Sequence, residues 1–185
     1  MDKVSTDNAL PGLYVHWPWC VRKCPYCDFN SHQVTPETDE PAFVAALLAD
    51  LDDELQFSAA DGISSIFFGG GTPSLMSGDA VVALLDGVRA RLPLTPDCEI
   101  TLEANPGAVD AGHFDAYRKA GISRLSIGVQ SFSAQSLSAL GRIHSPDDAR
   151  QAAQMARDAG FDNLNLDLMY GLPGQDVAGA LDDLE

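Results

Sequence analysis

The sequence predicts an α/β fold in which parallel strands alternate with helices, arranged as part of a (β/α) barrel. Runs rich in β-forming residues alternate with segments of helical periodicity, and no hairpin signal interrupts them. Such alternation indicates parallel strands joined by right-handed crossovers. A doubly wound sheet fits this alternation as well. The barrel is favoured because a polar or glycine-rich cluster follows each predicted strand, as at the mouth of a barrel.

The first half of the chain contains three of the expected strands. The expected elements, in order, are strand 13–17, helix 42–57, strand 63–68, helix 80–92 and strand 99–102. The strands are short runs rich in β-branched and aromatic residues. The first helix places Phe43, Leu47, Leu51 and Leu55 at helical spacing.

The second half of the chain repeats the alternation. The expected elements are helix 111–120, strand 122–129, helices 134–140 and 146–159, strand 164–169, and a last helix that follows Gln175 and is still running at Glu185. Gly121 and Gly160 stand where two of these helices should end. Ser145 can cap the helix that starts at Pro146, because proline suits the first helical position.

Length and charge narrow the class of protein. The chain has 185 residues, the size of one domain, and 27 acidic against 11 basic residues give a formal charge of −16. This excess disfavours binding to nucleic acid or to anionic membranes. No apolar run is long enough to span a bilayer and no signal peptide precedes the first strand, so the expected compartment is the cytoplasm. Twelve of the acids fall in two segments interpreted as solvated outer helices, whereas Arg22 and Lys23 make the cysteine segment locally basic.

Three of the four cysteines, Cys20, Cys24 and Cys27, fall within eight residues in the pattern C-x3-C-x2-C. Clustered thiols in a reducing compartment indicate metal or cluster ligation rather than disulfides. Three thiolates can hold three irons of a four-iron cluster and leave the fourth iron open. The alternative is zinc, with His16 or His32 completing a tetrahedron. The remaining cysteine, Cys98, is interpreted as a buried, inert thiol on a strand.

Other candidate site residues stand at the ends of predicted strands. The run Gly69-Gly70-Gly71-Thr72-Pro73 either brings backbone close to a ligand or forms a tight turn. Glu103 and Asp167 can accept hydrogen bonds from ribose hydroxyls or an ammonium, or from a neighbouring loop. Arg142 can bind a carboxylate through two donors or form a surface ion pair. Tyr14 and Tyr26 flank the cysteines and either pack over a cofactor or fill the barrel mouth.

These motifs carry a resemblance to a known family. Tyr14-Val-His-Trp-Pro-Trp-Cys20-Val-Arg-Lys-Cys24-Pro-Tyr-Cys27 resembles the signature of the radical SAM superfamily. Four further motifs resemble its oxygen-independent coproporphyrinogen III oxidase-like branch, and in particular the haem chaperones of that branch. They are Leu-Glu103-Ala-Asn-Pro-Gly, Ser-Ile-Gly-Val-Gln130-Ser-Phe, Leu140-Gly-Arg142-Ile-His and Asn-Leu-Asp167-Leu-Met-Tyr-Gly-Leu-Pro.

The resemblance implies a role for each site residue. Cys20, Cys24 and Cys27 would hold a [4Fe–4S] cluster, and S-adenosylmethionine (SAM) would bind its fourth iron. The implied contacts of that SAM are Tyr14, Gly70 and Glu103. The positions that match a second SAM in the oxidase are Tyr26, Gly71, Thr72, Gln130, Arg142 and Asp167. No residue is assigned a catalytic role beyond this site.

The resemblance also implies two functions. The first is a haem chaperone that binds haem or porphyrin, passes it to haem-acceptor proteins, with possible peripheral contact with membrane haemoproteins, and needs a reductant for the cluster. The second is oxidative decarboxylation of coproporphyrinogen by a radical generated from SAM. Phe29 argues against the second, because the oxidase has a further cysteine at that place. A zinc-binding interaction module is the remote third hypothesis.

The resemblance implies that 185 residues are only part of a larger protein. The family has a six-strand partial barrel followed by a C-terminal domain, whereas only five strands are predicted here. We therefore expect a flexible N-terminus at 1–9 and a radical SAM core at 10–185 that lacks its last strand and the C-terminal domain. An open sheet edge would make such a fragment poorly stable or prone to aggregation.

Overall fold

A computed structural model describes residues 10–58, 60–109 and 111–185 of the chain. The predicted flexible N-terminus, 1–9, lies outside the described residues. The main sheet has five strands, which are β1 (Gly12–Trp17), β4 (Ile63–Gly70), β5 (Leu94–Ala104), β6 (Arg124–Gln130) and β7 (Asn163–Leu168). All four neighbouring pairs are parallel, as the sequence predicts.

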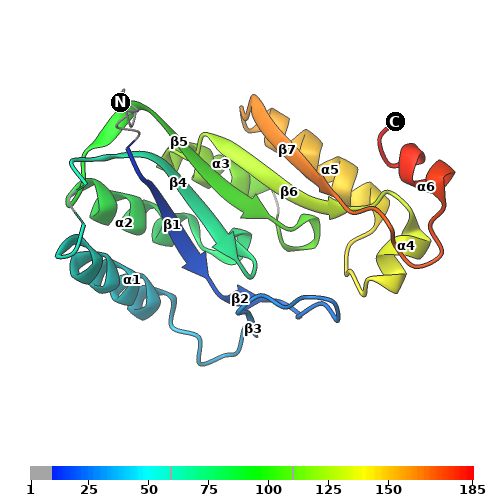
Figure 1. Cartoon of the computed structure of the whole chain (residues 1–185), viewed down its shortest axis with the longest axis horizontal. Coiled ribbons are helices and arrows are strands. Elements are labelled where there is room, and N and C mark those ends of the chain that lie inside the picture. Colours follow the sequence, from blue (N-terminus) through cyan, green and yellow to red (C-terminus); the bar gives the residue numbers. More distant parts are fainter. Residues whose placement is uncertain (1–9, 59, 110) are drawn as a thin grey trace, which may run out of the picture.

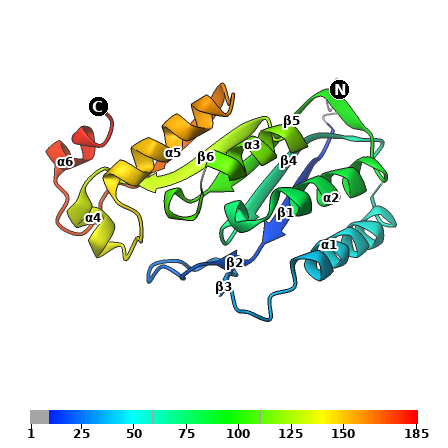
Figure 2. The same cartoon turned by 180° about the vertical axis from the view of Figure 1, so that it is seen from behind.

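The strand order separates the two predicted topologies. In the main sheet the order is β1-β4-β5-β6-β7, so each new strand joins the same growing edge. A doubly wound sheet reverses its order at one point, and this sheet does not. The helices α1, α2, α3 and α5 accordingly lie on one face of the sheet (Figures 1 and 2). The predicted class, part of a (β/α) barrel, is confirmed, with β1 and β7 as its two edges.

In the residues that the structure describes, six helices connect or follow the strands. Their bounds are α1 Glu40–Leu55, α2 Gly78–Arg89, α3 Ala111–Ala120, α4 Ala134–Ala139, α5 Pro146–Asp158 and α6 Val177–Asp182, with short 3₁₀ turns η1 Pro73–Leu75 and η2 Pro106–Ala108. Ser145 and Asp148 form a capping box at the start of α5, which confirms the predicted cap. Among the residues that the structure describes, no helix combines the length and apolar character needed to cross a bilayer.

The last helix was predicted wrongly, because α6 ends at Asp182 instead of continuing to Glu185. Val177, Leu181 and Leu184 are all exposed, so a longer helix would gain little burial. The carboxylate of Asp183 is buried instead. It accepts hydrogen bonds from Ser131 Oγ at 2.8 Å and from the Phe132 backbone N–H at 2.6 Å, which ties this end of the chain to the turn after β6.

Alternation along the strands gives the sheet one apolar and one polar face. The side toward the helices is buried and apolar, with Ile66, Phe68, Ile100, Leu102, Leu125, Ile127 and Val129 in the core. The intervening positions of β5, β6 and β7 are mostly polar: Glu99, Thr101, Glu103, Arg124, Ser126, Asn163, Asn165 and Asp167. Since no described helix covers this second face (Figure 1), it is the inner, concave side of the partial barrel, and it leads to the functional site.

Candidate functional site

The three clustered cysteines lie on a loop at the carboxyl end of β1. The loop is held at its base by two short strands that the sequence did not predict, β2 (Trp19–Cys20) and β3 (His32–Gln33). The His32 N–H donates to Pro18 O at 2.8 Å, and the Val34 N–H donates to Cys20 O at 2.8 Å. All four cysteines of the chain are free thiols; Cys20 is buried, and Cys24 and Cys27 are half-buried. The base of the loop is thus fixed, whereas its thiols stay available to a ligand.

The glycine run after β4 packs against the start of the cysteine loop. Gly70 has a φ of +116°, which side chains rarely allow. A Cβ on Gly71 would lie 2.7 Å from the backbone carbon and oxygen of Pro18. The Gly71 and Thr72 N–H groups donate to Trp17 O and Trp19 O at 2.7 and 2.8 Å. The glycine run was predicted to bring its backbone close to a ligand or to form a tight turn, and part of it lies close to the protein's own backbone. The hydrogen bonds join the turn after β4 to the start of the cysteine loop.

Tyr117, on α3, supports the turn from below. Its hydroxyl is fully buried and donates to Met76 O at 2.6 Å, with Ser74 O at 3.0 Å. We expect Tyr117→Phe to lower the free energy of unfolding by about 1 to 2 kcal/mol, since it leaves buried carbonyls unpaired. Urea unfolding of the two proteins measures this. An unchanged midpoint would show that the turn does not depend on the hydroxyl.

Two carboxylates, those of Glu103 and Asp167, lie near the glycine run on the polar face of the sheet. Burial raises the pKa of Glu103, and the nearby Asp167 adds to this, against a lowering by a hydrogen bond from the Gly70 backbone. Asp167 accepts hydrogen bonds from Ser126 Oγ at 3.0 Å and from Asn165 Nδ2 at 2.6 Å. The Asp167 carboxylate is therefore oriented by two side chains, and the Glu103 carboxylate is destabilised in a way that a bound cation would relieve.

Gln130 and Arg142 complete the ring of polar groups. Gln130 has a φ of +70°, and it is the one described residue other than glycine with a positive φ. Such a conformation costs on the order of 1 kcal/mol or more and is typical of functional sites. The Arg142 guanidinium donates to Gly128 O at 2.7 Å and faces Cys24 Sγ at 3.8 Å. Its Nε is buried and has no hydrogen-bond partner. The contacts of the Arg142 guanidinium therefore join the end of β6 to the cysteine loop.

These segments enclose one cavity of about 340 Å³. Eleven of the twelve predicted site residues line it: Cys20, Cys24, Tyr26, Cys27, Gly70, Gly71, Thr72, Glu103, Gln130, Arg142 and Asp167. Burial raises the pKa of Tyr26, and the Arg142 guanidinium opposes that shift. Five segments far apart in sequence therefore converge on one mouth, as the strand-end pattern predicts.

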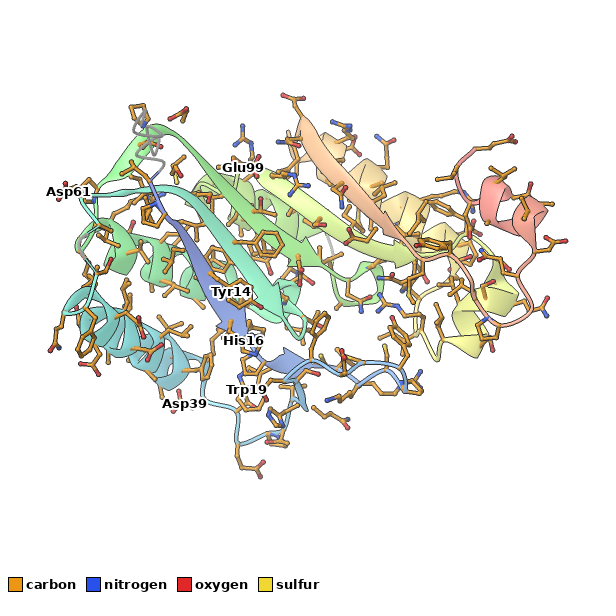
Figure 3. All side chains as sticks on the ribbon, viewed as in Figure 1. Tyr14, His16, Trp19, Asp39, Asp61 and Glu99 are labelled. Carbon is orange, nitrogen blue, oxygen red and sulfur yellow. The ribbon has the colours of Figure 1, made fainter. Side chains whose placement is uncertain are left out.

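Tyr14 is the predicted residue that does not line this cavity. Tyr14 and His16 lie on the same, exposed side of β1 (Figure 3). The Tyr14 hydroxyl and His16 Nδ1 are 3.2 Å apart, and the Tyr14 ring stacks on Phe67. Burial and the charge of Glu103 raise the pKa of Tyr14. The phenol is therefore close enough to the site for the Glu103 charge to affect it, although it does not line the cavity.

The cavity is also lined by Arg22, Phe29 and Pro73, which the sequence analysis noted without assigning them a contact. The lining residues missed from the sequence are Ala104, Asn105, Ser126, Gly128 and Met169. Ser126 could have been found, because it lies four residues before Gln130 and therefore on the same face of β6. Asn165 could have been found in the same way from Asp167. Cys98 lies on a strand as predicted, but it is half-buried, and burial raises the pKa of its thiol.

The donors at the site fit an iron–sulfur cluster better than a single zinc ion. Zinc needs its ligands at about 2.0 to 2.3 Å from one point. Within the described ranges, no three His, Cys, Asp or Glu side chains are grouped to hold one ion. A cluster spreads its thiolates over several irons, so three free thiols around one cavity suit it, with Arg142 beside Cys24 to balance charge. The zinc alternative gains no support from this geometry.

Comparison with known proteins identifies the class. The model of the radical SAM superfamily matches residues 14–185. The chain therefore belongs to the radical SAM superfamily, whose members carry a [4Fe–4S] cluster and use SAM.

Within that superfamily, the chain is similar to "Heme chaperone HemW" of Escherichia coli, with 56% identity over 172 residues that cover 93% of this chain and 46% of that protein. It is also 42% identical to the bovine "Radical S-adenosyl methionine domain-containing protein 1, mitochondrial" over 189 residues, which cover 100% of this chain and 42% of that protein. Among solved structures, the coproporphyrinogen III oxidase HemN of E. coli matches with a TM-score of 0.84 and 28% identity, over 95% of this chain and 41% of that one. The chain thus spans less than half the length of these relatives.

Proposed function

We propose that this chain is the cluster- and SAM-binding part of a haem chaperone. The observation that carries the proposal is the single cavity in which three free thiols meet Glu103, Gln130, Arg142 and Asp167. The likeness to HemW supports the haem part of the proposal. When bound, the cluster supplies one-electron chemistry to SAM.

The residues of the chain divide the work of holding these groups. Cys20, Cys24 and Cys27 would ligate the cluster. Glu103, on the inner face of β5, would accept a hydrogen bond from the SAM ammonium, which relieves its buried charge. Asp167, held by Ser126 and Asn165, would accept from ribose hydroxyls, and Arg142, which lines the cavity, would bind a carboxylate through its guanidinium.

The remaining predicted contacts are supporting ones. Gly70, Gly71 and Thr72 would let the ligand approach the turn after β4. Tyr14 and Tyr26 would border the ligand from either side of the loop. We also propose haem-acceptor proteins and a reductant as partners, and the cytoplasm as the compartment, since it keeps thiols such as these reduced.

Anaerobic reconstitution of the complete protein with iron and sulfide tests the proposal. We expect the EPR signal of a reduced [4Fe–4S] cluster, and we expect SAM to change it because SAM binds the open iron. A haem-transfer assay with an apo-haemoprotein then tests the chaperone function. A cluster signal that SAM leaves unchanged would contradict the proposed site.

Coproporphyrinogen oxidation is the second candidate, and the structural likeness to HemN favours it. Phe29 opposes it, because it lines the cavity with a largely exposed aromatic ring where the oxidase would have a thiol. We therefore expect no consumption of coproporphyrinogen by the reconstituted complete protein. Turnover in that assay would replace the chaperone proposal with the oxidase.

A further inference from the structure

The end of β6 is irregular at the point where it enters the cavity. The pairing of β6 with β7 shifts register between Ile127 and Gln130. Gly128 and Val129, which lie inside this shift, have no paired residue on β7. A backbone carbonyl that leaves the ladder must find another donor, because an unpaired buried carbonyl is costly.

The loop between α4 and α5 supplies both donors. Arg142 Nη2 lies 2.7 Å from Gly128 O, and His144 Nε2 lies 3.0 Å from Val129 O. Two side chains spaced two residues apart therefore satisfy two successive carbonyls of the irregular segment. The second of these carbonyls belongs to the peptide bond that leads into Gln130.

The His144 imidazole is suited to a fixed structural contact. Its side chain is 4% exposed, and its Nδ1 has no hydrogen-bond partner. Since Nε2 faces a carbonyl, the proton of the neutral ring must be on Nε2. Burial and the Arg142 charge lower the pKa of His144, which keeps the ring neutral. The neutral ring then donates one hydrogen bond through Nε2, while the lone pair of its buried Nδ1 has no donor.

Gln130 is held from both sides by these contacts. On one side His144 binds the carbonyl that precedes it. On the other side the Met169 N–H donates to Gln130 O at 2.8 Å. Its left-handed backbone, φ +70°, is unfavourable for a residue with a side chain and persists only where its surroundings enforce it. This conformation places Gln130 on the cavity wall.

We propose that His144 is a positioning residue that fixes the left-handed Gln130 in the SAM cavity without touching the ligand. In the part of the chain that the structure describes, His144 does not line the cavity, whereas Gln130 does. The inference rests on the proposed role of Gln130 in binding SAM. It extends that role to a buried residue 14 positions later in the chain.

The test is a double-mutant cycle on SAM affinity in the complete, cluster-loaded protein. We expect His144→Leu to weaken SAM binding, measured by equilibrium dialysis, by about 10-fold. Without the imidazole, Gln130 would no longer be held in place and its contact with SAM would be lost. In a Gln130→Gly background, His144→Leu should change the affinity no further. His144→Gln should restore binding, because its amide can donate to Val129 O. Additive effects of the two substitutions would overturn the proposal.

A second readout needs neither cluster nor SAM. Hydrogen exchange at the Met169 amide reports whether Gln130 O still accepts its bond. We expect His144→Leu to speed this exchange about 10-fold and His144→Gln to leave it near the wild-type rate. Phe161→Leu, a buried change at the other end of β7, controls for general destabilisation and should not affect this amide selectively.

The two readouts separate the possible failures. If the wild-type protein binds no SAM, the proposed function fails, and the exchange experiment still decides whether His144 positions Gln130. If SAM binds but Met169 exchanges at the same rate in His144→Leu and the wild type, the positioning role is wrong and the proposed function stands.

Discussion

Cys24→Ala is expected to abolish the [4Fe–4S] cluster, and Cys20→Ala and Cys27→Ala should do the same. Each leaves two thiolates at the cavity, and the loop offers no free thiol to replace the third. Fe–S clusters depend on thiolate ligands, so the loss should be complete rather than graded. Iron and sulfide content after anaerobic reconstitution, together with the EPR signal, measures it.

Cys98→Ala is the matched control. Cys98 is also a free thiol, but it lies on β5 away from the cavity, and burial and Asp97 raise the pKa of its thiol. Less of it is the thiolate that binds metal. We expect this variant to hold as much iron as the wild type. An equal loss in all four variants would indicate non-specific iron uptake and would contradict the assigned ligands.

Glu103→Gln is expected to have the second largest effect, a loss of SAM affinity of about 10- to 100-fold. The substitution keeps the shape but removes the charge, and a hydrogen bond to a charged group contributes about 1.5 to 3 kcal/mol. Equilibrium dialysis with cluster-loaded protein measures the affinity. Glu99→Gln is the control, since Glu99 lies on the same strand and the same face but outside the cavity. If both variants bind SAM equally, Glu103 is not a SAM contact.

Glu103→Gln should weaken SAM binding, but it should favour the folded state of the ligand-free protein, relative to the wild type, as the pH rises toward neutral. Burial raises the pKa of Glu103 in the folded chain, so the folded state binds that proton more tightly than the unfolded state. The wild type therefore loses stability as the pH rises from the unfolded pKa of Glu103 through its folded pKa. The amide introduced by Glu103→Gln does not titrate, so we expect this variant to gain stability relative to the wild type as the pH rises from about 4 to about 7. Urea unfolding without ligand across that range measures the difference, and parallel curves would contradict it.

The sequence predicts the fold well because alternation is a strong local signal. Every strand of the main sheet and every helix is present, and the capping residues at Ser145 and the stops at Gly121 and Gly160 mark helix ends correctly. The wrongly predicted boundaries are those at which a tertiary contact determines where a strand begins or a helix ends. The strand β5 starts at Leu94, five residues earlier than predicted, because Leu94 pairs with Ile63 of β4. The helix α6 stops early because Asp183 turns in to bind Ser131.

The residues of the site also divide into those that the sequence predicts and those that only the structure reveals. Residues that stand at strand ends were predicted, since parallel strands bring their carboxyl ends together. The supporting contacts of Asp183 and His144 were not predicted, because their partners Ser131 and Val129 lie on other segments, 52 and 15 positions away in the sequence. The irregular end of β6 shows this limit plainly. Gly128 and Val129 look like ordinary strand residues in the sequence, and only the register shift shows that their carbonyls need donors from another segment.

The contact between Asp183 and the turn after β6 also sets an order in time. Chains are synthesised at about 5 to 20 residues per second, so Asp183 follows Cys27 by roughly 10 to 30 seconds. During that interval the cysteine loop exists, but Ser131 and Phe132 lack their buried acceptor. The turn after β6 therefore acquires its buried acceptor only after every residue that lines the cavity, from Cys20 to Met169, has been made.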